Sequence, residues 1–131
     1  MLRRALTGCL TLAAGLTVIA APAAHADIHT DFKAPYARAA AIIDADGSLN
    51  EGKNVIKAWR AATGRYCVQL SRYIDARESL IQLTPRHAVR LPHIAYRHPS
   101  ATCRLDNTIT VHVYSTNTGR LADSGFDLLV S

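Results

Sequence analysis

The chain has 131 residues, of which 49% are hydrophobic and 19% charged. The composition is typical of a globular protein, and the length suffices for one small domain but not for two. The net charge of +5 falls to +3 when a predicted leader is removed, because Arg3 and Arg4 are two of the 15 basic residues and none of the 10 acidic residues lies in the leader. So small an excess of positive charge gives no indication of nucleic-acid binding, and no nucleic-acid partner is predicted.

Residues 1–26 have the pattern of a cleaved export signal. Arg3 and Arg4 form a charged head, an apolar run follows, and a small-x-small sequence at residues 24–26 precedes Asp27. We therefore expect cleavage after residue 26, a secreted extracellular protein, and no membrane contact after processing. The paired arginines leave both the general and the twin-arginine export routes open.

The mature chain is expected to begin with an extended arm over residues 27–37, which is polar, contains Pro35 and has no clear period. From there, short apolar runs separated by turn signals predict strands. The expected strands are Ala39–Ile43, Val55–Arg60, Tyr66–Leu70, Leu80–Thr84, Ile94–Arg97, Thr108–Tyr114 and Phe126–Val130. This number of short strands in about one hundred residues predicts an all-β fold, a small antiparallel β-sandwich over residues 38–131 that is immunoglobulin-like.

The alternation is cleanest at Ile109–Val113, where Ile109, Val111 and Val113 share one face and Thr110 and His112 share the other. This pattern predicts a half-buried antiparallel strand.

Glycines end three turn signals, Asp44–Gly47, Ala62–Gly64 and Asn117–Gly119, and suit tight reversals that need positive φ. The stretch Ser71–Ser79 is the main helix candidate. Three prolines are expected between strands, where a missing backbone donor has no cost: Pro85, Pro92 and Pro99.

Cys67 and Cys103 are the two cysteines that remain after removal of the leader. An even count in an exported chain predicts one disulfide, and two free buried thiols are the alternative. The bridge would stabilise the fold by roughly 3 to 4 kcal/mol by restricting the unfolded chain. We expect Tyr66 and Val68 to face away from Cys67 and to pack inward with Leu70.

The most functional-looking part of the chain is the basic segment Thr84–Pro99. Its arginines and histidines are Arg86, His87, Arg90, His93, Arg97 and His98. The histidine spacing fits neither one strand face nor one helix face, so no metal site is predicted. The pattern predicts an exposed loop and an edge strand without a specific function. The functional alternative is a surface that binds an anionic ligand or an acidic partner.

Two further features have an ordinary and a functional interpretation. Asp44, Asp46 and Gly47 are similar to the start of a calcium loop, but the third ligand and the closing glutamate are missing, which favours a polar hairpin turn. Trp59, the only tryptophan, is expected to be a core anchor, and an exposed ring at a sugar or protein site is the alternative.

No catalytic signature is present: the chain has no Gly-x-Ser-x-Gly elbow and no His-Glu-x-x-His motif. We therefore predict neither an enzyme nor a cofactor. The alternative is a small secreted hydrolase such as a ribonuclease, in which Glu51 or Glu78 would act with His87, His93, His98 or His112. A stand-alone ligand-binding protein is a further alternative.

Four stretches together resemble small secreted actinobacterial β-sandwich proteins. They are Ile42–Leu49, Gly64–Leu70, Cys103 followed by Ile109–Val111, and Asp123–Val130. The resemblance implies the sandwich fold and carries no catalytic residue. Size, export signal, strand pattern and arm also resemble the adaptor subunit of the umbrella-shaped toxin particles of Streptomyces, which implies a role in an extracellular assembly.

The predicted function is that of a non-catalytic binding or adaptor module whose partner is another secreted protein. The arm supplies two aromatic anchors, Phe32 and Tyr36. The basic segment supplies the remaining predicted binding residues, which are Arg86, Arg90, His93 and Arg97.

Overall fold

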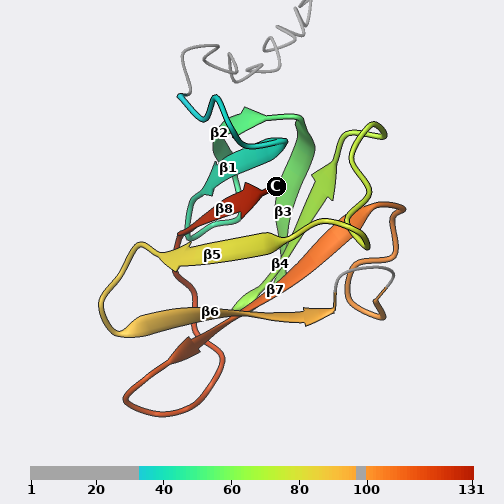
Figure 1. Cartoon of the computed structure of the whole chain (residues 1–131). Helices are drawn as coiled ribbons and strands as arrows, with labels where there is room; N and C mark the ends of the chain where they lie inside the picture. Colours follow the sequence, from blue (N-terminus) through green and yellow to red (C-terminus); the bar gives the residue numbers. More distant parts are fainter. Residues whose placement is uncertain (1–32, 97–99) are drawn as a thin grey trace, which may run out of the picture.

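The computed structural model describes residues 33–96 and 100–131, which form eight strands (Figure 1). The predicted signal segment lies outside these residues, as do Phe32, Arg97 and His98. The strands are β1 (Ala39–Ile43), β2 (Leu49–Lys53), β3 (Val55–Ala62), β4 (Arg65–Leu70), β5 (Ile81–Pro85), β6 (Arg90–Tyr96), β7 (Thr108–Ser115) and β8 (Phe126–Val130). Within the described part, no helix has the length and apolarity needed to span a bilayer.

The strands form two antiparallel sheets of four strands each. The first sheet has the order β2-β1-β8-β5 and the second sheet the order β3-β4-β7-β6. The predicted all-β antiparallel sandwich is therefore confirmed, with eight strands in place of about seven. Its likeness to an immunoglobulin domain lies in the two-layer architecture, since the strand order is different.

The core lies between the two sheets and is formed by alternate residues of their central strands. Val111 and Val113 of β7 and Leu128 and Val130 of β8 are buried there, because strand side chains alternate between the two faces. The predicted inward set is confirmed: Tyr66, Val68 and Leu70 are buried in the same cluster. The ring of Tyr66 meets that of Phe126 edge to face at 5.4 Å between centroids, which joins the two layers.

Three expectations about local structure are wrong. Strand β2 was not predicted, because its sequence Leu-Asn-Glu-Gly-Lys has no apolar alternation and it lies at a sheet edge. Two of the three prolines expected between strands lie within strands: Pro85 is the last residue of β5 and Pro92 lies inside β6, while Pro99 is outside the described residues. Both strands are sheet edges, which need fewer backbone donors. Residues Ser71–Ser79 form turns and no helix.

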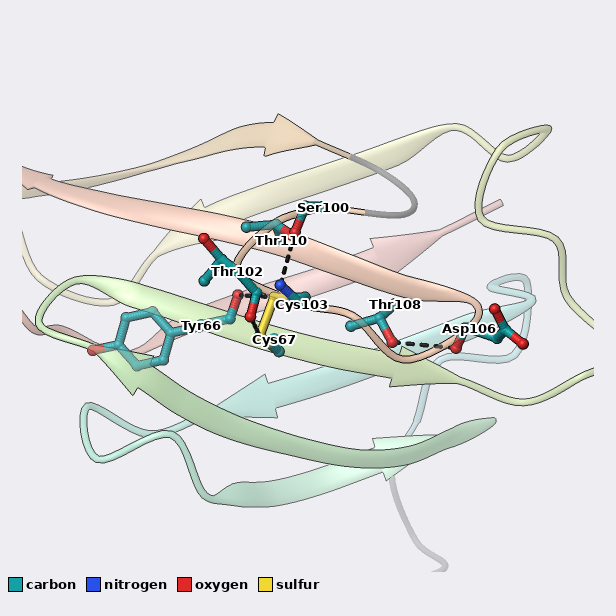
Figure 2. The surroundings of a disulfide bond; sticks show 8 residues. All are labelled: Tyr66, Cys67, Ser100, Thr102, Cys103, Asp106, Thr108 and Thr110. Carbon is teal, nitrogen blue, oxygen red and sulfur yellow. Dashed lines mark hydrogen bonds between the residues drawn. A yellow bond between two sulfur atoms is a disulfide. The ribbon is translucent and has the colours of Figure 1, made fainter.

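The disulfide Cys67–Cys103 is present, as predicted, and its two cysteines are 36 positions apart in the chain. It fastens the connection between β6 and β7 onto the second sheet, on the face away from the core (Figure 2). Ser100 adds to this attachment, because its hydroxyl is hydrogen-bonded to that of Thr110 and accepts the backbone N–H of Cys103 at 2.8 Å. The loop is thus held at two points on the outer face of β4 and β7.

Candidate binding surfaces

The structure does not bring the predicted basic residues together on one surface. Arg86 follows β5 of the first sheet, where its Nε lies 3.7 Å from Asp127 Oδ1. Arg90 is half-buried and donates from Nη1 to the Val89 carbonyl and the Ser115 hydroxyl, both at 3.1 Å. His93 lies on β6 of the second sheet and is exposed.

The root of the N-terminal arm is fixed to the first sheet by hydrogen bonds. Lys53 of β2 donates from Nζ to the carbonyls of Ala34 at 2.9 Å and Ala37 at 2.8 Å. The backbone N–H of Arg38 donates to the Val130 carbonyl at 2.8 Å. The turn over residues 34–37 is therefore held in place, and its Tyr36 side chain is 97% exposed.

A groove of about 250 Å³ lies between the arm and the outer face of the first sheet. Lys33 and Ala34 form its arm side. Its floor consists of the outward residues of three strands, which include Ile42 of β1, Leu129 of β8 and Gln82 of β5. The groove therefore has a mixed lining, in which Ile42 and Leu129 lie among the polar residues Gln82, Thr84 and Asp127.

On the outer face of the second sheet, three basic side chains form a row across three strands. His112 of β7 is the register partner of Arg65 on β4 and of His93 on β6. Because Val111 and Val113 face the core, the alternation of the strand directs His112 outward. We call Arg65, His112 and His93 the basic row.

His112 is the most constrained member of the basic row. Its Nδ1 lies 3.5 Å from the Tyr114 hydroxyl, and its Nε2 is shielded from solvent without a hydrogen-bond partner among the described residues. Burial, together with the nearby Arg65 and His93, lowers the pKa of His112. Alternation within Ile109–Val113 indicated the direction of His112, but its neighbours come from other strands and could not be inferred from it.

Trp59 does not anchor the core, so that prediction is wrong. Its register partner is Cys67, which faces away from the core, and the indole is half-buried outside the core cluster. The ammonium of Lys57 lies 5.0 Å from the ring centroid, a cation–π arrangement that covers part of the ring.

A network around Asp123 that the sequence analysis did not identify is structural. Its carboxylate accepts from Arg60 Nε and Nη2, both at 2.9 Å, and from the Gly64 N–H at 2.7 Å. The pKa of Asp123 lies below its ordinary value, mainly because Arg60 donates hydrogen bonds to the carboxylate. Tyr66 Oη lies 3.3 Å from the same carboxylate and donates to the Ala45 carbonyl at 2.8 Å. The network joins three loops at one end of the sandwich.

The acidic residues between β1 and β2 form the predicted polar hairpin turn. Asp46 Oδ1 accepts from the Ser48 N–H at 2.9 Å and from its hydroxyl at 2.6 Å. Gly47 has a φ of 90°, which favours glycine. Within residues 33–96 and 100–131, no group of three or more histidine, cysteine or acidic side chains is placed to hold a metal ion.

Comparison of the chain with protein-family models finds no matching family, and comparisons with curated proteins and with solved structures find no matching relative.

Proposed function

We propose that the protein is a secreted, non-catalytic binding module that attaches to another extracellular protein through its N-terminal arm. The observation that carries this proposal is the combination of a fixed backbone and an exposed aromatic ring at the arm root. Tyr36 is 97% exposed, while Lys53 holds the carbonyls on either side of it. An aromatic side chain on a pre-organised turn loses little conformational entropy on binding, which favours affinity.

The surroundings of Tyr36 also suit a protein partner. The floor of the groove beside the arm includes Ile42 and Leu129 together with Gln82, Thr84 and Asp127, so a partner that holds Tyr36 can place an apolar side chain of its own against the two apolar residues. Phe32 immediately precedes the described part of the arm and is the second predicted anchor. Exposed aromatic side chains and apolar contacts are typical of the centre of a protein interface.

The sheet edges are less suited to binding by strand addition. Strand β3 has two register irregularities, and β6 contains Pro92 and one irregularity. Edge β5 ends at Pro85, and β2 pairs with β1 through a bulge. Bulges and prolines of this kind protect edges from pairing with other chains. Recognition through the arm and through side chains of the sheet faces therefore fits the domain better.

The proposal is tested by affinity capture from the native culture supernatant with four forms of the protein: intact, lacking residues 27–37, Tyr36→Ala and Tyr73→Ala. Tyr73 is the matched control, because it is 74% exposed on a different loop. We expect the intact protein and Tyr73→Ala to retain one partner that the other two forms lose. Recovery of the same proteins by all four forms, or of none by the intact protein, would exclude the arm as the binding element.

A further inference from the structure

We propose that the basic row on the outer face of the second sheet binds an acidic peptide segment of a partner protein. This inference rests on the proposed function, because it assigns a second contact surface to the same binding module.

The basic row presents its donors in a line. Arg65, His112 and His93 come from the adjacent strands β4, β7 and β6 and are register partners on one face. Neighbouring strands lie about 4.8 Å apart, so the row is about 10 Å long. Arg65 and His93 are the two exposed ends of the row and can donate hydrogen bonds to more than one carboxylate of an extended segment, whereas His112 Nε2 is shielded from solvent between them.

The positive charge of the row is not neutralised from within the described protein. Arg65 makes no ion pair among the described residues, whose ion pairs are those of Arg60 and Arg86. His112 lies between Arg65 and His93, and these two basic residues are the charged groups that act on it. Like charges placed opposite one another in a sheet are unfavourable. A carboxylate ligand would relieve this repulsion, which is the charge complementarity that favours an acidic partner.

A peptide fits this face better than an acidic polysaccharide does. Sugar rings stack on exposed aromatic faces, but Trp59 is half-buried under Lys57. Tyr114 is also half-buried and meets His112 edge to face at 6.3 Å between centroids. Leu91 lies two residues before His93 on β6, on the same face, and its aliphatic side chain is 51% exposed. An acidic segment with an apolar residue matches both the charge and this apolar contact.

The row and the arm lie on opposite faces of the sandwich. Lys53, which holds the arm, pairs with Ala40 on the first sheet, whereas the row lies on the second sheet. The core of the domain separates the two surfaces. Two partners can therefore occupy the domain at once, which is the geometry that an adaptor requires.

The test is an NMR titration of the imidazole signals at about pH 6, below the ordinary pKa of a histidine side chain. The probe is hexaglutamate with blocked ends, hexaglutamine is the uncharged control, and tetragalacturonate represents an acidic glycan. We expect hexaglutamate alone to shift the His93 and His112 signals in a saturable manner. His87, exposed in the loop between β5 and β6, is the internal reference and is expected to remain unchanged.

Variants assign the binding to the row. Arg65→Gln and His93→Gln, both at exposed positions, are expected to weaken hexaglutamate binding at least about tenfold, as loss of a charge-assisted hydrogen bond should. Arg77→Gln, an exposed arginine of the loop between β4 and β5, is the matched control and should bind as the wild type does. Circular dichroism checks that each variant is folded.

Several results would overturn the inference: no shift with hexaglutamate, an equal shift of His87, an equal effect of hexaglutamine, binding of tetragalacturonate in place of the peptide, or equal affinities of Arg65→Gln and Arg77→Gln. The titration does not involve the arm. A negative titration would exclude the acidic-peptide site and leave the proposed binding through the arm unaffected. Failure of the arm experiment would in turn leave the result of the titration unaffected.

Discussion

The side chain of Asn107 donates a hydrogen bond to the carbonyl of Ile74 at 2.6 Å, although 33 positions separate the two residues. The same amide donates to the Ser71 carbonyl at 2.9 Å and accepts the Ala76 N–H at 3.0 Å. One asparagine thus supplies the partners that a helix over residues 71–79 would have supplied internally. Asn107 also has a φ of 53°, a left-handed conformation that asparagine adopts more readily than most residues.

Replacement of Asn107 is therefore expected to destabilise the protein strongly. Asn107→Ala should lower the free energy of unfolding by about 2 to 4 kcal/mol, because it removes several hydrogen bonds and places alanine at positive φ. Asn107→Gly should cost less, since glycine tolerates this φ. Urea unfolding measures both, with the exposed Asn117→Ala as control. Equal stability of Asn107→Ala and Asn117→Ala would show that the amide does not hold the loop.

Lys53 is expected to control the order of the arm root more than the stability of the domain. Lys53→Met removes the ammonium that holds the Ala34 and Ala37 carbonyls and should cost about 1 kcal/mol of global stability. Trypsin cleavage after Lys33 should become several-fold faster, because proteolysis follows local opening. Lys57→Met is the control, and equal cleavage rates for the two variants would contradict this account of the arm.

Loss of the disulfide should remove a large part of the stability. The double variant Cys67→Ala with Cys103→Ala is expected to lose roughly 3 to 4 kcal/mol of unfolding free energy, because the unfolded chain gains the freedom of the open loop. Urea unfolding of the variant and of the reduced wild type should give similar midpoints. An unchanged midpoint in both would mean that the loop between β6 and β7 is held without the bridge.

Stability is expected to fall in mildly acidic solution because of His112. Burial, Arg65 and His93 lower the pKa of His112 in the folded protein. As the pH falls below about 6.5, the ordinary histidine pKa, this residue therefore binds more protons in the unfolded chain than in the folded protein. The contribution of His112 is complete above that value and is lost as the pH falls through the folded pKa. Unfolding free energies between about pH 7.5 and pH 5 should therefore decline less steeply in His112→Gln than in the wild type. His87→Gln is the control, and a slope in His112→Gln as steep as in this control would refute the assignment.

The arrangement of the basic row shows where sequence reasoning about the site stopped. The period of two in Ile109–Val113 places His112 on the outer face, and that much is local. Its neighbours Arg65 and His93 lie on strands far along the chain, and their alignment depends on the registers of β4 and β6 with β7. A shift of one residue in either register would turn the partner side chain to the other face. The segment around Arg86, Arg90 and His93 is continuous in sequence but is divided in space, because β5 and β6 belong to different sheets.

The sequence by itself determined the fold class, because alternation of apolar residues and turn signals are local properties that specify strands. It also predicted the disulfide that the structure contains, because two cysteines remain after the predicted leader. The secreted location and the binding role stay predictions. Three features depend on the tertiary structure alone. The polar segment β2 is a strand, the side chain of Asn107 hydrogen-bonds the backbone of residues 71–76 in place of a helix, and Lys53 holds the arm. Each of these features depends on contacts between residues that are distant in the chain. Such contacts form, and stabilise the protein, only when the two sheets have packed together.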